Sequence, residues 1–294
     1  MRILHLDGGS ELRGGQWQVL RLVEGLGAEG ISSTLLCRGA LLEEARKRGL
    51  DARPLGWWRI AALARQSDLL HAHDARSHTM ALLAAAGRPL VVARRVAFPV
   101  RSPWKYRRAA RYIAVSRYVE GVLAEGGVAR ERIEVVYDGV PELPEAAGPR
   151  QGVLAAALAD PLKGRGLIRQ AAASAGIEVR FSSHLEADLP AFALFVYITE
   201  SEGLGSAVLL AMAASTPVIA SRVGGLPEVV EDGVTGLLVE NSPEAIAAAI
   251  RRLLGDSALA VAMAARARRT AAERFSVASM VRGTIDVYRK VLAC

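Results

Sequence analysis

A carboxylate and two glycine turns in the second half of the chain are spaced to bind an anionic ligand. The first turn directly follows a glutamate and precedes a run of small residues of helical character, a Pro-led strand and the second turn. This order of strand, turn and helix predicts a pocket at the carboxyl edge of a parallel sheet, where backbone amides are free to meet an anion. The candidate residues of the two turns are Glu202, Gly203, Leu204, Gly205, Gly224, Gly225, Leu226 and Glu228.

Lys163 and Gly164 stand where the first strand of this half ends and a helix begins. A lysine at that place can reach a diphosphate while the amides of the helix N-terminus point the same way. A Lys-Gly pair alone is typical of an ordinary turn. Together with the Glu202 turn about forty residues later, the pair is a stronger sign of a site that binds a diphosphate.

In the first half, polar residues follow the ends of predicted strands. Gly14 and Gly15 lie in a glycine-rich loop whose spacing is not that of the dinucleotide-binding fingerprint. His71, His73 and Asp74 end a later strand, where both histidines share one face and no third ligand is assigned, so we predict no metal site. We expect His73 or Asp74 to line an acceptor cleft, and the alternative is a core or helix-capping role.

Arg94 and Arg95 end the next strand and are predicted to project into the same cleft, where they suit an anionic acceptor. They belong to a basic stretch, because residues 75–119 include ten Lys or Arg and no Asp or Glu in a chain of net charge +7. Phe98 and Trp104 lie within this stretch. Basic side chains among aromatic ones favour an anionic membrane surface or a phosphorylated acceptor. The alternative is an ordinary solvated face, and no nucleic-acid module accompanies the charges.

Apolar runs alternate with helical periodicity along the whole chain of 294 residues, which predicts βαβ units with parallel sheets. Predicted strands cover 2–6, 32–37, 51–55, 69–73, 89–93, 112–115 and 133–137, then 153–159, 177–181, 194–198, 217–221 and 236–239. Predicted helices cover 16–28, 40–48, 79–86, 117–125, 166–175 and 206–214, and most of the chain after Ser242. The Pro- and Gly-rich segment 141–152 is predicted to be a linker.

Two Rossmann-like, doubly wound α/β domains facing one another across a cleft are therefore expected. The first domain covers 1–143 and the second covers 150–275, with a last helix over 276–292 that crosses back to the first domain. No apolar run is as long as a bilayer-spanning helix, and the first residues turn polar too soon for a signal peptide. Cys37 and Cys294 have no metal-ligand spacing, so a reduced cytoplasm is the expected location.

The turn at Glu202 closely resembles the donor-site signature of retaining glycosyltransferases of family 4, which have the GT-B architecture. Lys163 and Gly164 match the Lys-Gly pair of that family. Two positions differ: Leu210 stands where the family has a second glutamate eight residues after the first, and Leu158 stands where it has an arginine. Further likeness lies in 113–116, 131–140 and the C-terminal tail, so the resemblance covers nearly the whole chain. The second domain is shorter than usual, because only about twenty residues separate Ala175 from Leu194.

The resemblance implies that Glu202 binds hydroxyls of the transferred sugar, that Lys163 holds the leaving diphosphate, and that the loop from Gly224 to Glu228 lies near the nucleotide. It also implies that the loop with Gly14 and Gly15 faces the cleft and contacts the acceptor or a phosphate. It implies retention without a metal or other cofactor. We therefore expect a cytoplasmic glycosyltransferase, peripheral at the inner face of the cell membrane, that transfers a sugar from a nucleotide-sugar to a lipopolysaccharide, another cell-surface glycan or a lipid-linked acceptor. The alternative is a GT-B protein that has lost transfer and binds a nucleotide, a sugar or a partner.

Overall fold

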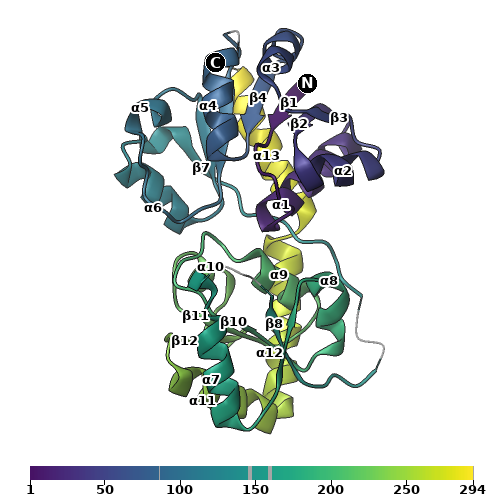
Figure 1. The fold of residues 1–294 in the computed structure, drawn as a ribbon, viewed down its shortest axis with the longest axis vertical. Coiled ribbons are helices and arrows are strands. Elements are labelled where there is room, and N and C mark those ends of the chain that lie inside the picture. Colours follow the sequence, from purple (N-terminus) through teal and green to yellow (C-terminus); the bar gives the residue numbers. More distant parts are fainter. Residues whose placement is uncertain (86, 145–147, 158–160, 294) are drawn as a thin grey trace. The chain divides into compact units, whose positions relative to one another are not determined.

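The computed structural model describes residues 1–85, 87–144, 148–157 and 161–293, and its chain divides into two compact units. Unit 1 comprises Met1–Gly139 and Val277–Cys294, and unit 2 comprises Val140–Ser276. Figure 1 shows the helices and strands of both. Among the described residues, no helix combines the length and the apolar character needed to cross a bilayer.

Unit 1 contains a parallel sheet of seven strands in the order β3-β2-β1-β4-β5-β6-β7. Its strands are β1 (Arg2–Leu6), β2 (Ser32–Cys37), β3 (Ala52–Pro54), β4 (Leu69–Ala72), β5 (Leu90–Arg94), β6 (Arg111–Ala114) and β7 (Ile133–Val135). Its helices are α1 (Gly14–Ala28), α2 (Gly39–Lys47), α3 (Trp57–Ala64), α4 (Ala75–Ala84), α5 (Pro103–Tyr106), α6 (Arg117–Glu125) and α13 (Val277–Leu292), with the 3-10 turn η1 (Arg130–Arg132).

The last helix of the chain completes the core of unit 1. Met280, Ile285 and Tyr288 of α13 are buried against apolar strand residues such as Ile3 and Val91. Figure 1 draws α13 in yellow beside α1, with which it packs. Strands such as β5 are buried along their length, as expected where helices cover both faces of a parallel sheet.

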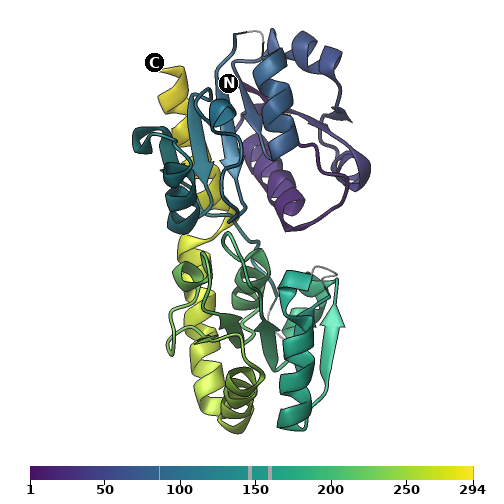
Figure 2. The same cartoon turned by 60° about the vertical axis from the view of Figure 1, so that its left-hand side comes forward.

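Unit 2 contains a parallel sheet of five strands in the order β12-β11-β10-β8-β9. Its strands are β8 (Val153–Ala156), β9 (Val179–Ser182), β10 (Leu194–Tyr197), β11 (Val218–Ser221) and β12 (Leu237–Val239). Its helices are α7 (Arg165–Ala175), α8 (Leu185–Asp188), α9 (Ser206–Ala213), α10 (Leu226–Val229), α11 (Pro243–Gly255) and α12 (Ser257–Arg274), with the 3-10 turns η2 (Pro161–Lys163) and η3 (Leu189–Ala191). Ile168, Ile250 and Met263 pack on the strands, and Figure 2 shows β9 at the edge of the sheet.

The prediction of two doubly wound parallel sheets is confirmed, and the twelve predicted strands are all present with bounds that differ by at most three residues. The predicted end of the strand over 153–159 includes residues 158–160, which lie outside the described part of the chain, and so does Ala86 of the helix predicted over 79–86. That helix begins earlier than predicted, at Ala75, because Asp74 caps it. Helices α3, α5 and α8 were not predicted.

Each sheet has a point where the strand order reverses, and such points place ligands at the carboxyl ends of parallel strands. In unit 1 the reversal lies between β1 and β4, and in unit 2 it lies between β8 and β10. Lys163 follows β8, and Glu202 follows β10. The fold of unit 2 therefore places the two principal candidates of the sequence at the same switch point.

Candidate functional site

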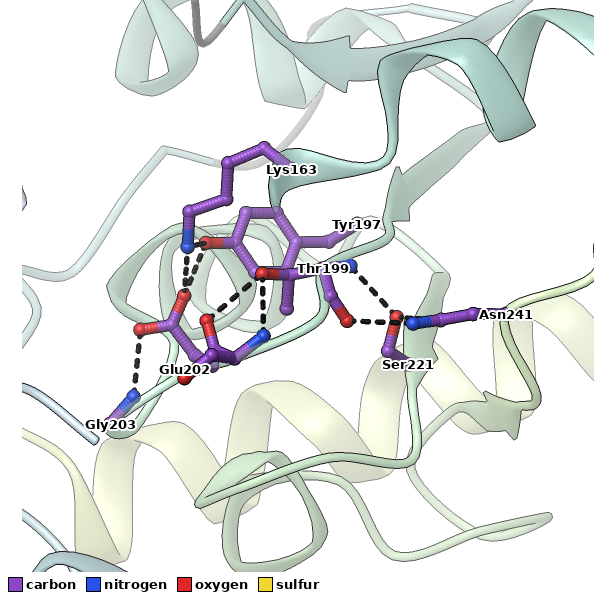
Figure 3. A network of polar contacts seen from close by, with 8 residues as sticks. Lys163, Tyr197, Thr199, Glu202, Gly203, Ser221 and Asn241 are labelled. Atoms are coloured by element: carbon purple, nitrogen blue, oxygen red, sulfur yellow. Dashed lines mark hydrogen bonds and ion pairs between the residues drawn. The ribbon is translucent and has the colours of Figure 1, made fainter. Parts of the chain in front are cut away.

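Lys163, Tyr197 and Glu202 form a closed polar cluster at the switch point of unit 2 (Figure 3). The Nζ atom of Lys163 lies 2.7 Å from Oε2 of Glu202 and 3.0 Å from the hydroxyl of Tyr197. The Tyr197 hydroxyl donates to the same Oε2 over 2.5 Å. The Lys163 and Glu202 side chains are only 18% and 16% exposed, so this pair is shielded from much of the solvent. Charge and hydroxyl together fit a ligand that has both phosphate and sugar groups.

Gly164 is what allows Lys163 to turn into this cluster. Its backbone is left-handed, with φ +56°, and a Cβ there would lie 2.5 Å from Cγ2 of Ile198. Only glycine meets both conditions without strain. The amide of Glu200 donates to the carbonyl of Leu162 over 2.9 Å, which ties the turn of Lys163 to the end of β10. Helix α7 then begins at Arg165, so its first amides lie close to the lysine in sequence.

A second hydrogen-bonded set holds the loop that carries Glu202 (Figure 3). Ser221, at the end of β11, accepts from the amide of Thr199 over 2.8 Å and donates to Oδ1 of Asn241 over 2.6 Å. The side-chain amide of Asn241 donates to the carbonyl of Thr199 over 2.9 Å. Three neighbouring strand ends are thereby fixed together, and Glu202 follows Thr199 by three residues. This support orients the carboxylate before any ligand binds.

The second glycine turn lies directly on the first. A Cβ on Gly224, whose φ is +56°, would lie 2.0 Å from the carbonyl oxygen of Glu202, and one on Gly225 would lie 2.1 Å from that of Gly203. The amide of Gly225 donates to the carbonyl of Glu202 over 3.1 Å. Both positions therefore require glycine for close backbone approach. Gly205 has φ +106° and leads into α9.

The remaining predicted donor residues divide into core and rim positions. Leu204 and Leu226 are buried, so their side chains act in packing, although their backbone stays in the turns. Glu228 is half-buried, and its carbonyl accepts from Arg274 over 3.4 Å. Leu210 is half-buried on α9 and has no polar side-chain atom to offer a ligand. Leu158 lies outside the described residues.

In unit 1, the switch point between β1 and β4 carries Asp7 and Asp74. Asp74 accepts from the amides of Arg76 and Ser77 over 2.7 and 3.1 Å, and from the amide of Gly8. Asp74 therefore caps α4, which is the alternative role left open by the sequence. Burial, followed by the charge of Asp74, raises the pKa of Asp7.

His73 is the middle of a chain of hydrogen bonds. Its Nδ1 lies 3.4 Å from Nη1 of Arg95, which can only donate, so Nδ1 accepts. Burial, followed by the neighbouring charges, lowers the pKa of His73 well below its ordinary value, so the ring is neutral and its proton sits on Nε2. That atom lies 3.0 Å from Nδ1 of His5 and donates to it. His71 contacts the hydroxyl of Tyr288 over 2.6 Å.

Sequence reasoning found no third ligand beside His71 and His73, and on this point it was wrong, because β1 places His5 opposite His71. Ligand atoms of the three imidazoles lie within 4.8 Å of one another. Their arrangement nevertheless does not fit a metal ion. A cation there would lie close to the positive charge of Arg95, whose Nη1 is 3.4 Å from Nδ1 of His73.

Arg94 and Arg95 have different surroundings because successive strand residues point to opposite faces. Arg95 forms an ion pair with Asp138 over 3.0 Å, and its side chain passes 3.8 Å from where a Cβ on Gly15 would be. Arg94 is buried and donates to the hydroxyl of Tyr106 and the carbonyl of Phe98. The predicted role of Arg94 at an acceptor is not favoured by these contacts. Gly14 is the first residue of α1.

Sequence reasoning missed Tyr197, Asp7 and His5. Tyr197 is the last residue of β10 and the last but one of the apolar strand predicted over 194–198, and a polar tip near a strand end was the available signal. Asp7 directly follows the first strand in the same way. His5 lies within a strand and had no sequence signal, because only the pairing of β1 with β4 brings it to His71 and His73.

Comparisons with known proteins identify the family. A model described as "Glycosyltransferase Family 4" matches residues 12–142, and one described as "Glycosyl transferases group 1" matches residues 130–256. The alpha-maltose-1-phosphate synthase of Mycobacterium tuberculosis is 40% identical over 112 residues, which are 36% of this chain and 29% of that protein. The D-inositol 3-phosphate glycosyltransferase of Kineococcus radiotolerans is 41% identical over 103 residues, which are 32% of this chain and 23% of that protein. These matches thus span less than a third of either curated relative.

Solved structures show the same fold along the chain. HepE of Anabaena, in complex with UDP and glucose, superposes with a TM-score of 0.86 at 19% identity, covering 99% of this chain and 100% of that one. Sucrose-phosphate synthase of Thermosynechococcus elongatus gives a TM-score of 0.83 at 17% identity, covering 99% of each chain. The chain therefore has the GT-B fold and belongs to the group 1, family 4 glycosyltransferases.

Proposed function

We propose that this protein transfers a sugar from a nucleotide-sugar donor bound in unit 2. The observation that carries the proposal is the contact of Lys163 with Glu202 at the switch point of a family 4 chain. Lysine suits the diphosphate of the donor and the carboxylate suits the sugar hydroxyls. HepE, the solved neighbour named above, binds UDP and glucose, which supports this choice of ligand class.

Donor binding must change the partners of Lys163 and Glu202. The diphosphate draws the ammonium group away from Oε2, and hydroxyls of the sugar then donate to the released carboxylate. The Tyr197 hydroxyl, already bonded to both groups, limits how far they separate. As the glycosidic bond breaks, Lys163 and the first amides of α7 and α9 stabilise the negative charge that develops on the leaving diphosphate. We propose that this transfer retains the anomeric configuration and needs no metal.

The acceptor belongs, in this proposal, at the carboxyl edge of the unit 1 sheet. Arg95 and His73 supply a positive charge and a neutral hydrogen-bonding ring there. These groups suit an anionic or lipid-linked glycan, in keeping with cell-surface glycan or lipopolysaccharide synthesis at the inner face of the cell membrane. Of the ten basic residues in 75–119, Arg94 and Lys105 are buried with internal partners and Arg95 is paired with Asp138, so the other seven provide any contact with an anionic membrane.

A second candidate function is a GT-B protein with altered or lost transfer that binds a nucleotide or sugar. Leu210 favours it, because leucine cannot accept hydrogen bonds from a ribose. Loss of such a contact costs about 1.5–3 kcal/mol where the partner is charged. Donor affinity would then rest on the Lys163 cluster alone.

Calorimetric titration with a panel of nucleoside diphosphates and their sugars tests the first candidate. We expect one donor to bind and to be slowly hydrolysed, and we expect both properties to be lost in Lys163→Ala. Binding without hydrolysis or transfer to any glycan would favour the second candidate. Absence of binding to every donor would refute both. Gly166→Ala is a matched control, because nothing lies within 4 Å of the added Cβ.

A further inference from the structure

Unit 1 has a hollow of about 770 Å³ at the amino edge of its sheet. The hollow lies where β5 begins at Leu90 and β6 begins at Arg111, beside the end of α4. His73 and Asp74 follow the opposite, carboxyl ends of the strands, and the five residues of β5 separate the two edges by about 16 Å. This hollow is therefore distinct from the proposed acceptor edge.

Four arginines line the hollow, and none of its lining residues is acidic. They are Arg88, Arg108, Arg111 and Arg132. Three come from the basic stretch recognised in the sequence, and the fold adds the fourth through η1. Guanidinium groups gathered without a carboxylate repel one another, and a bound anion relieves that repulsion.

Backbone carbonyls, and not carboxylates, orient these side chains. Arg88 donates to the carbonyl of Arg65 over 3.0 Å, and Arg132 donates to that of Arg107 over 3.1 Å. Arg111 donates to the carbonyl of Ala110 over 3.0 Å, while its buried Nε has no partner within the described chain. Across the described ranges, no ion pair within 4.0 Å involves any of the four. Each retains N–H groups for a ligand.

The hollow also has an apolar wall. Leu82 and Leu83 of α4 line it, and Leu83 is 68% exposed. Arg108 lies over the ring of Trp104, with its Cζ atom 5.4 Å from the ring centre. The planar, forked donors of arginine match the oxygens of phosphate. Apolar surface beside them suits a ligand whose phosphate is attached to carbon.

We propose that this hollow binds a phosphate monoester or diphosphate group, independently of the donor site in unit 2. The group is carried either by the headgroup of a phospholipid or by a soluble phosphorylated molecule. Both sources present the same chemistry to the arginines, so experiment must separate them. The proposal does not depend on sugar transfer.

Binding of inorganic pyrophosphate and flotation with vesicles test the proposal. Both are measured in the 294-residue chain carrying Lys163→Ala, so that the site in unit 2 does not contribute. The vesicles contain phosphatidylcholine with or without phosphatidic acid. The test variant is Arg88→Gln/Arg132→Gln, because both residues are exposed and donate to backbone carbonyls, so the change removes no side-chain partner within the described chain. Arg282→Gln/Arg289→Gln on α13 is the charge-matched control in the same unit.

We expect the affinity of the test variant for pyrophosphate to fall at least tenfold, or the test variant to stop floating with vesicles that contain phosphatidic acid. The control variant should keep both properties. Arg88→Lys/Arg132→Lys keeps the charge without the fork and should recover only part of the affinity. Loss in the pyrophosphate assay indicates a soluble ligand, and loss in flotation alone indicates a headgroup. The proposal is overturned if the Lys163→Ala protein without further changes binds neither pyrophosphate nor the vesicles with phosphatidic acid. It is also overturned if the test variant binds as well as the control variant.

Discussion

Removal of one hydroxyl group, in Tyr197→Phe, tests whether the unit 2 cluster acts as a donor site. The hydroxyl donates to Oε2 of Glu202 over 2.5 Å and accepts from Nζ of Lys163 over 3.0 Å. Phenylalanine keeps the stacking on Phe195, whose ring centre lies 6.2 Å away. The direct Lys163–Glu202 contact also remains, so we expect little change in the thermal midpoint.

The expected effect on catalysis follows from the charge of the partners. A hydrogen bond to a charged group contributes about 1.5–3 kcal/mol. If the hydroxyl fixes Glu202 against the sugar as the bond breaks, its loss lowers kcat/KM by about 10- to 150-fold. The fall should lie mostly in kcat, because Lys163 still binds the diphosphate. Uniform loss of ground-state binding would instead appear in KM.

The effects on kcat and on KM are separated by measuring donor hydrolysis. The assay compares Tyr197→Phe, Tyr118→Phe and the unmutated protein, with the nucleotide-sugar that the unmutated protein hydrolyses. Tyr118 is 45% exposed in unit 1 and controls for the loss of a phenol. Suppose that Lys163→Ala is inactive but Tyr197→Phe has the same kcat/KM as the unmutated protein. That result would refute a positioning role for Tyr197. A rise in KM alone would assign the hydroxyl to donor binding.

Four further predictions concern the glycine turns, the ligand, the buried histidines and the acceptor edge. Gly224→Ala should abolish donor binding in calorimetry, because its Cβ meets a carbonyl oxygen at 2.0 Å and its backbone is left-handed; normal binding would contradict this account of the turn. A nucleoside diphosphate should bind about tenfold or more weakly than the corresponding nucleotide-sugar, because it leaves Glu202 without hydroxyl partners; equal affinities, or a preference that persists in Glu202→Gln, would disprove this. Below pH 6.5 the free energy of unfolding should fall by at most about 1.4 kcal/mol per pH unit for each buried histidine. The reason is that burial lowers the pKa of His78 from 6.5 to about 3, so only the unfolded chain takes up protons in this range; urea unfolding from about pH 7.5 to pH 5 should show a smaller slope for His78→Leu. Arg95→Met should destabilise unit 1 by about 3–5 kcal/mol, because it removes the positive charge that pairs with the buried carboxylate of Asp138, and thermal unfolding of Arg95→Met/Asp138→Asn should recover much of that loss.

The strands and the proximity of Lys163 to Glu202 follow from sequence because their signals are local. Apolar runs bounded by turns located every strand to within three residues. Lys163 and Glu202 could be placed together because each follows a strand of one parallel sheet, whose carboxyl ends share an edge. Strand order did not have to be known for that inference.

Side-chain direction on buried strands could not be predicted. Where both faces of a sheet are covered, a strand is apolar throughout and gives no alternation to read. Arg94 and Arg95 therefore looked equivalent, although only Arg95 reaches His73. In the same way, His5 joins His71 across 66 residues of chain through the register of β1 and β4. Such contacts depend on pairing, which local sequence does not encode.

The resting state of the unit 2 cluster sets what kind of ligand it can accept. Lys163 and Glu202 satisfy one another within a shielded site, so a ligand gains affinity only if it replaces both partners. A phosphate alone takes the lysine and leaves a buried carboxylate facing like charge, whereas a neutral sugar alone leaves the ammonium group where it is. A molecule with a diphosphate at one end and sugar hydroxyls at the other satisfies both at once. The selectivity we propose for nucleotide-sugars therefore arises from the ion pair itself, and Tyr197 preserves it by holding the two charges in register.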